Sequence, residues 1–217
     1  MQYLYPFVIS FTLIFFSELG DKTQILVLSF SAKNKTSNIL LGVALGTFFS
    51  HGLAIVLGSK LGVMGNANFI YNLKFLTYCT FFLFGIIGIL KSCKGASITE
   101  NTETNSKSSI IRFLVSLTKN CVLVVASTIA VGELGDKTFL ASIGLGLEYP
   151  LFKIPLIGGS ICGMVASNSV AVFFAKWLGS KISTSAIETI SNIIFVLFGI
   201  IGLLGLFWKK DPVPFSK

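Results

Sequence analysis

The chain has 217 residues, of which 53% are hydrophobic and only 12% are charged, and its mean hydropathy is +0.83. This composition excludes a soluble globular protein, because a water-exposed surface requires roughly twice that share of charged residues. The formal net charge of +8 does not indicate a nucleic-acid partner, because the basic residues are scattered beside apolar runs and Arg112 is the only arginine. We therefore expect an integral membrane protein surrounded by a lipid bilayer.

Six apolar runs have about the 20 residues that cross a hydrocarbon core of roughly 30 Å as a helix. They cover residues 4–31, 39–59, 69–90, 121–147, 154–175 and 187–208. The first run lacks a positively charged leader and a cleavage-site pattern, so we expect it to be retained as the first helix. The sequence predicts an all-α protein with six transmembrane helices. Lys74 lies inside the third run and leaves open the alternative that one run does not cross.

The sequence is internally duplicated. ELGDKT occurs at 18–23 and again at 133–138, an offset of 115, and LFGIIG occurs at 83–88 and 197–202, an offset of 114. These offsets divide the chain into a first three-helix repeat (1–90), a hydrophilic central loop (91–120), a second three-helix repeat (121–208) and a polar C-terminal tail (209–217). Because three is an odd number, the second repeat must enter the membrane from the opposite side, which predicts two inverted repeats.

The distribution of basic residues predicts an orientation. Nine Lys and Arg residues fall on the side of the central loop, whereas six fall on the side of the two termini. Cytoplasmic loops carry an excess of Lys and Arg, so we expect the central loop to be cytoplasmic.

Both ELGDKT motifs place ionisable residues inside apolar runs. Four of the nine acidic residues lie in them, namely Glu18, Asp21, Glu133 and Asp136. A charged group at the centre of a span costs on the order of 3 kcal/mol, so a function is the better explanation. On a continuous helix, residues at i, i+3 and i+4 share one face. Gly20 and Gly135 permit local unwinding, which would turn a backbone carbonyl inward.

Two facing motifs would carry a net charge of −2. One divalent cation or two protons would neutralise them, which is the basis of an exchange mechanism. All candidate ligands are oxygens, which favours Ca²⁺, Mn²⁺ or Mg²⁺ over Zn²⁺ or Cu²⁺. We expect Lys22 and Lys137 to pair with the carboxylates, and Thr23 and Thr138 to add hydroxyls. The alternative is an ion-pair network that only stabilises the fold, but it would leave two carboxylates without a cationic partner.

Other polar and small residues lie inside the second run of each repeat. His51, the only histidine, corresponds to Asn168, and Ser50 corresponds to Ser167 beside it. These four residues would form either a polar layer around the site, a proton path, or hydrogen bonds that hold helices together. Pairs of glycines spaced four apart predict close helix packing, namely Gly42 and Gly46, Gly58 and Gly62, and Gly159 and Gly163.

The doubled E-x-G-D-[KR]-[ST] signature, in a six-run chain split by a hydrophilic loop, resembles the GDT-one family of cation/proton antiporters, once catalogued as uncharacterised protein family sixteen, in the LysE-like superfamily. The resemblance covers nearly the whole chain. It implies a transporter rather than an enzyme, with Mn²⁺ or Ca²⁺ exchanged for protons and no cofactor. Glu18, Asp21, Glu133 and Asp136 would hold the cation. The chain lacks the targeting peptide of organellar members, so the expected location is a bacterial plasma membrane.

Three other functions fit parts of the sequence. A passive divalent-cation channel would use the same carboxylates without alternating access, and a basic amino-acid exporter is allowed by the LysE-like resemblance. An intramembrane lipid phosphatase is less favoured, because phosphate chemistry generally uses arginine clamps and Arg112 lies in the central loop. The sequence predicts no oligomeric state.

Overall fold

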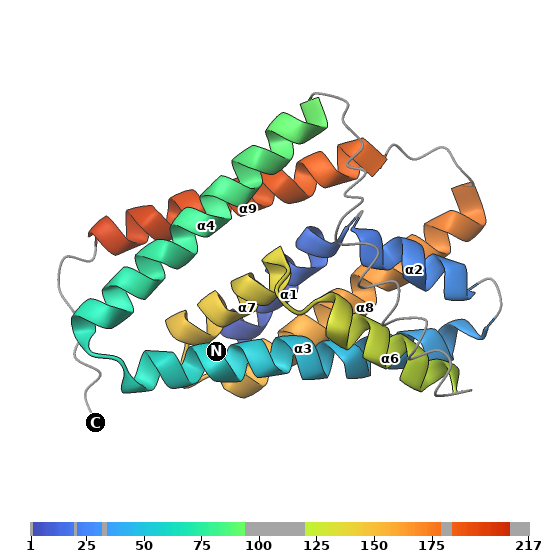
Figure 1. Ribbon diagram of the computed structural model, residues 1–217, viewed down its shortest axis with the longest axis horizontal. Coiled ribbons are helices and arrows are strands. Elements are labelled where there is room, and N and C mark those ends of the chain that lie inside the picture. The colour runs from blue at the N-terminus through green and yellow to red at the C-terminus, as the bar shows by residue number, and fades with distance from the viewer. Residues whose placement is uncertain (1, 20, 32–33, 94–119, 179–183, 209–217) are drawn as a thin grey trace.

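The computed structural model describes residues 2–19, 21–31, 34–93, 120–178 and 184–208. Side chains of some helical residues, including Lys22 and Thr23, lie outside the description. The described residues form helices and no strand, so the predicted all-α class is confirmed for them (Figure 1). The helices are α1 (Leu4–Glu18), α2 (Lys22–Ser31), α3 (Thr36–Met64), α4 (Ala67–Cys93), α6 (Cys121–Gly132), α7 (Lys137–Glu148), α8 (Lys153–Leu178) and α9 (Thr184–Trp208).

Three described segments are long and apolar enough to cross a membrane, namely Thr36–Met64, Ala67–Leu90 and Lys153–Phe173. Leu4–Glu18, Cys121–Gly132 and Asn192–Trp208 are apolar but shorter. Large apolar side chains along α4, such as Leu76, Leu83 and Leu90, are exposed, as expected for a lipid-facing helix because lipid tails replace the protein interior there.

The first and fourth apolar runs are not continuous helices. The first is divided into α1, which ends at Glu18, and α2, which begins at Lys22, while the fourth is divided into α6 and α7 between Gly132 and Lys137. The prediction that the motif residues project from one face of an uninterrupted helix is therefore wrong. The unwinding that Gly135 was expected to permit does occur, and it separates the carboxylates from the following helix.

Helix α1 packs against α8 with both helices running in the same direction. A Cβ atom at Gly159 would collide with the carbonyl oxygen of Phe7, and one at Gly163 would lie 2.7 Å from the carbonyl oxygen of Phe11. Ser10 adds a polar contact, because its hydroxyl donates a hydrogen bond of 2.8 Å to the Leu156 carbonyl. The predicted close packing at these glycines is confirmed, and it joins the first helix of one repeat to the second run of the other.

Helix α3 makes the equivalent contact with α6 and α7. A Cβ atom at Gly42 would lie 2.7 Å from the Cβ atom of Val125, and one at Gly46 would lie 2.7 Å from that of Ile129. Further along α3, a Cβ atom at Gly58 would collide with the carbonyl oxygen of Ile143. Residues with higher numbers on α3 therefore contact residues with higher numbers on α6 and α7. The broken helix α6–α7 thus runs parallel to α3.

Helices α4 and α9 lie side by side along one edge of the molecule (Figure 1). A Cβ atom at Gly85 would lie 2.7 Å from the backbone nitrogen of Val196, whereas one at Gly199 would lie 2.7 Å from that of Phe82. Residues with higher numbers on α4 therefore contact residues with lower numbers on α9, so the two helices are antiparallel. The glycines of the repeated LFGIIG sequence allow this close approach.

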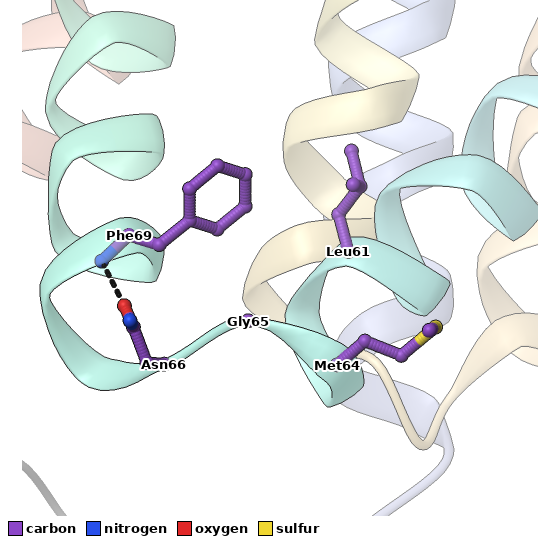
Figure 2. Close-up of a pocket in the computed structure, with 5 residues that line it drawn as sticks. All are labelled: Leu61, Met64, Gly65, Asn66 and Phe69. Carbon is purple, nitrogen blue, oxygen red and sulfur yellow. Dashed lines mark hydrogen bonds between the residues drawn. The ribbon is translucent and has the colours of Figure 1, made fainter.

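A short turn joins α3 to α4 (Figure 2). The Asn66 side chain begins α4 by accepting a hydrogen bond of 2.8 Å from the backbone N–H of Phe69, which satisfies a donor that the first turn of a helix leaves without a partner. A cavity of about 370 Å³ lies beside the turn and is lined by Leu61, Met64, Gly65, Asn66 and Phe69. It contains no residue of either motif.

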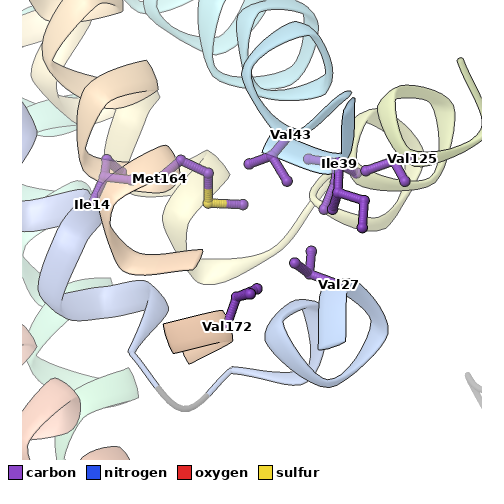
Figure 3. Close-up of a cluster of buried hydrophobic side chains, with 8 residues drawn as sticks. Ile14, Val27, Ile39, Val43, Val125, Met164 and Val172 are labelled. Carbon is purple, nitrogen blue, oxygen red and sulfur yellow. The ribbon is translucent and has the colours of Figure 1, made fainter. Parts of the chain in front are cut away.

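Two buried apolar clusters fill the interior. The first apolar cluster consists of Ile14, Val27, Ile39, Val43, Val125, Ile129, Met164 and Val172 (Figure 3). The second apolar cluster consists of Leu13, Ile55, Phe81, Ala141, Leu145, Leu156 and Phe195. Val43 and Ile55 lie twelve residues apart on α3, which corresponds to about 18 Å along a helix axis. The clusters therefore occupy different depths of the protein.

Candidate cation site

Each motif has an equivalent backbone hydrogen bond at its helix break. The backbone N–H of Asp21 donates to the carbonyl of Glu18 at 3.2 Å, and the N–H of Asp136 donates to the carbonyl of Glu133 at 3.1 Å. The carbonyls of Asp21 and Asp136 each accept a hydrogen bond of 3.1 Å from the helix that follows, in the first copy from the N–H of Gln24 three residues later and in the second from the N–H of Leu140 four residues later. Each copy thus places one carboxylate at a helix end and one before a helix start.

Glycine is required at the second break. Gly135 has a φ of +79°, in the left-handed region that other L-residues avoid. The neighbouring Leu134 is 46% exposed, so the break carries an apolar side chain outward while its carboxylates turn inward. Gly20, the equivalent glycine, lies outside the described residues.

The structure brings the two motifs together. Oxygen atoms of Glu18, Asp21 and Glu133 lie within 4.8 Å of one another. Glu18 is fully buried and Glu133 is 1% exposed, whereas Asp21 is half-buried. Asp136 is outside this group of three, but its carboxylate lies close enough to interact electrostatically with both glutamates. Carboxylates separated by 115 positions in the sequence therefore share one buried region.

The other motif residues surround these carboxylates unevenly. Thr138 donates a hydrogen bond of 3.1 Å from Oγ1 to Oε2 of Glu133. Lys137 is close enough to interact electrostatically with Glu18, and its Nζ atom lies 5.6 Å from the centre of the Phe195 ring. The expected pairing of this lysine with the carboxylates stays a prediction, and an aromatic ring of α9 lies beside its ammonium group. The side chains of Lys22 and Thr23 lie outside the description.

The polar residues singled out in α3 and α8 are buried but do not form one chain of hydrogen bonds. His51 Nδ1 and Ser142 Oγ are 2.7 Å apart, while Ser50 donates to the carbonyl of Gly46 at 3.1 Å. Asn168 donates to the carbonyl of Met164 at 2.9 Å. Each of these last two bonds stays within its own helix.

Sequence reasoning missed two partners of these residues. Gln24 donates a hydrogen bond of 2.7 Å to the hydroxyl of Ser167, and Ser142 is the partner of His51. Gln24 directly follows the first motif, and Ser142 lies one helical turn after Thr138. A search for any polar residue within one turn of each motif would have found both.

The three converging side chains would bind a metal ion through oxygen atoms, and the distances between these oxygens suit a single ion. Ca²⁺ takes oxygen ligands at about 2.3–2.6 Å, so two oxygens bound to one such ion can be up to about 5 Å apart, a range that includes the separations within 4.8 Å found here. Within the described residues, Oε1 of Glu133 is buried and has no hydrogen-bond partner. An unsatisfied carboxylate oxygen is costly in a buried site, and a cation would offset that cost.

An apolar helical protein with carboxylates buried at two helix breaks has the architecture of a membrane ion transporter. The chain matches the sequence model of the divalent cation/proton antiporter GDT1 family over residues 6–96 and 121–209, and it belongs to that family. The family comprises transporters rather than enzymes, as the sequence resemblance implied. No solved structure matches the chain significantly.

The chain is also similar to individual members of known name. It is 28% identical to "GDT1-like protein 1, chloroplastic" of Oryza sativa subsp. japonica, covering 88% of this chain and 59% of the relative. It is 23% identical to "Protein PAM71, chloroplastic" of Arabidopsis thaliana, covering 88% and 54%. It is 26% identical to the "Putative manganese exporter" of Vibrio cholerae, covering 87% and 86%. The chain thus spans little more than half of the plant relatives.

Proposed function

We propose that this chain exchanges Mn²⁺ or Ca²⁺ for protons across a membrane, and that Glu18, Asp21, Glu133 and Asp136 hold the cation. The observation that carries the proposal is the approach of Glu18, Asp21 and Glu133 within 4.8 Å, because the three carboxylates come from both motifs. The match to an antiporter family supports the reaction type. The name of the Vibrio cholerae relative refers to manganese export, which supports Mn²⁺ as one substrate.

Charge balance explains the exchange. The four carboxylates and the two motif lysines together carry −2, which one divalent cation neutralises. When the cation leaves, the buried carboxylates are stabilised by binding protons, because unpaired charges in a low-dielectric interior are costly. When a cation returns, it displaces those protons, since a ligating carboxylate must be deprotonated. Thr138 orients Glu133 through its hydrogen bond.

The proposed architecture is six spans arranged as two inverted three-helix repeats. It is supported by the parallel packing of α3 with α6–α7. Because α3 returns across the membrane after α1–α2, a helix parallel to α3 runs opposite to α1–α2. The antiparallel packing of α4 and α9 supports the same arrangement. In it, α1 with α2 and α6 with α7 are discontinuous spans whose breaks meet at one depth.

We assign Ser50, His51, Ser167 and Asn168 to a polar layer around the site. All four are buried, and two of them bond to the helices that follow the motifs, His51 to Ser142 and Ser167 to Gln24. They therefore hold α7 and α2 in place against the opposite repeat. Within the described residues, His51 Nε2 is buried without a hydrogen-bond partner.

The proposed location is a plasma membrane with the central loop on the cytoplasmic side. The bacterial relative, of which 86% is covered, supports a plasma membrane, and the excess of basic residues on the central-loop side supports the orientation. A reporter enzyme that is active only in the cytoplasm, fused within residues 91–120, would test it. Activity of the same reporter fused after residue 208 instead would reverse the orientation.

The function is tested by transport into vesicles that contain the purified full chain. Uptake of Mn²⁺ and Ca²⁺ should accelerate when a proton gradient is imposed and reverse when the gradient is reversed. Asp21→Asn and Asp136→Asn should each lower uptake at least about tenfold, because each removes a ligand charge while preserving shape. Glu103→Gln removes an acidic charge from the central loop and serves as the matched control.

Different outcomes would contradict different parts of the proposal. Uptake that is indifferent to the proton gradient would indicate a passive channel. Competition by excess lysine would indicate a basic amino-acid exporter. Proton-driven uptake that persists in both aspartate variants would remove these residues from the cation site.

A further inference from the structure

Glu148, the last residue of α7, joins that helix to α4 through two polar contacts. Its Oε2 atom lies 2.8 Å from Nζ of Lys74 and accepts a hydrogen bond of 2.9 Å from the Tyr78 hydroxyl. The side chains of Lys74 and Glu148 are only 22% and 30% exposed. Lys74 and Tyr78 are four residues apart, so they share one face of α4 and both contact the same carboxylate oxygen of Glu148.

This group of three residues lies away from the cation site, toward one face of the protein. Glu148 follows Lys137 by eleven residues on α7, which corresponds to about 16 Å along a helix axis. The same end of the molecule carries the contacts of Tyr5 with Tyr149 and of Tyr3 with Phe152, at ring separations of 6.0 and 5.8 Å. Aromatic residues of this kind are enriched where a membrane meets water. We name this end the α7–α8 face.

The second apolar cluster fills the space between Glu148 and the motifs. It includes Ala141 and Leu145 of α7 together with Phe81 of α4, and Ala141 is fully buried. An ion that leaves the motifs toward the α7–α8 face would have to pass this cluster, to which α7 and α4 both contribute. Small residues make α7 suited to moving aside, because Gly144 faces Thr77 of α4 and Gly146 faces the backbone of α3 at Ile55.

We propose that Lys74, Tyr78 and Glu148 form a latch that holds α7 against α4 and closes the path from the α7–α8 face to the carboxylates. The latch rests on the proposed transport function, since only a transported ion requires a path. A charge-assisted hydrogen bond is stronger than a neutral one, and two contacts to one oxygen hold the closed arrangement. When Glu148 separates from Lys74, the path from the α7–α8 face to the carboxylates opens.

The other repeat has an oppositely charged residue at the positions that correspond to Lys74 and Glu148, whereas Tyr78 corresponds to Asn192. The offset of 114 that relates the LFGIIG copies maps Lys74 onto Glu188, and the offset of 115 that relates the ELGDKT copies maps Glu148 onto Lys33. This correspondence is an observation on the sequence alone. Both side chains lie outside the described residues, and the proposed latch consists of Lys74, Tyr78 and Glu148.

Labelling of buried cysteines from one side of the membrane tests the latch. The full chain is prepared without its four native cysteines, and Ala141→Cys is introduced in the second apolar cluster. A membrane-impermeant thiol reagent is then added at the α7–α8 face. Glu148→Gln should raise the labelling rate of position 141 at least about fivefold, because it removes the negative charge that strengthens the contacts with Lys74 and Tyr78. Tyr78→Phe, which deletes a single hydroxyl, should raise it less.

The matched control is Val125→Cys in the first apolar cluster, labelled from the opposite face. Glu148→Gln should leave its labelling rate unchanged, and Lys74→Glu combined with Glu148→Lys should return position 141 to slow labelling. Unchanged labelling of position 141 in Glu148→Gln would overturn the latch. Equal increases at both positions would also overturn it, because they would indicate a loosened fold.

The labelling result and the transport result are independent, because labelling requires no cation movement. If Glu148→Gln accelerates the labelling of position 141, that result holds even if vesicles show no exchange of Mn²⁺ for protons. Conversely, proton-driven uptake together with unaltered labelling in Glu148→Gln would sustain the transport function and remove the latch.

Discussion

Glu18, the last residue of α1, and Glu133, the first residue after α6, place carboxylate oxygens within 4.8 Å of each other in a buried region. They occupy the same position in two copies of one six-residue sequence. Two buried glutamates at this separation repel each other when both are ionised. Their approach is therefore unfavourable unless protons or a cation neutralise them.

Cation binding should stabilise the protein against heat. Saturating Mn²⁺, at about 100 times its dissociation constant, should add about 2.7 kcal/mol to the free energy of unfolding, and the melting temperature in detergent should rise. The double variant Glu18→Gln with Glu133→Gln should lose this rise. Because protons compete for the same carboxylates, the rise should shrink as pH falls. A rise of equal size in the double variant would place the cation elsewhere.

The hydroxyl of Thr138 should tune cation affinity. Thr138→Val preserves the shape of the side chain but removes the hydrogen bond to Glu133. Such a bond contributes about 1 kcal/mol, so the Mn²⁺ concentration at half-maximal uptake should change about fivefold. Thr138→Ser retains the hydroxyl and should behave like the unchanged chain. If valine and serine gave the same value, the bond would not orient Glu133.

The turn at the second motif should require Gly135. Gly135→Ala forces a side chain into the left-handed region, at a cost of about 1–2 kcal/mol, and the melting temperature should fall by about 4 °C. Gly132→Ala, three residues earlier at the end of α6, is the control, because an added Cβ atom meets nothing within 4 Å there. Equal melting temperatures for the two variants would show that the turn tolerates a side chain.

The contact of α3 with α7 should depend on Gly58. A Cβ atom at this position would collide with the carbonyl of Ile143, and overpacking of this kind costs about 1–3 kcal/mol. Gly58→Ala should therefore lower the melting temperature and slow uptake, since α7 begins at the second motif. Gly52→Ala on the same helix meets nothing within 4 Å and should unfold at the usual temperature. A stable Gly58→Ala protein would mean that α7 shifts freely along α3.

Much of the fold was predictable from local patterns in the sequence. Runs of apolar residues predict membrane helices because the bilayer selects for length and hydropathy alone. Repetition of ELGDKT predicts equivalent turns, since identical short sequences have identical local preferences, and Glu18 and Glu133 do lie at the ends of corresponding helices, Glu18 as the last residue of α1 and Glu133 directly after α6. The helix break itself was predicted only as a permitted unwinding, because glycine allows such a turn without requiring it.

The sequence by itself determined that this is a helical membrane protein with a duplicated, charged motif, because composition, periodicity and repetition are properties of the chain that no folding partner can alter. Only the tertiary structure decided which helices meet. It packs α1 on α8 and α3 on α6–α7, sets Lys137 over Phe195, and attaches Glu148 to Lys74. These contacts join residues far apart in the sequence, and their geometry depends on the packing of every helix between them.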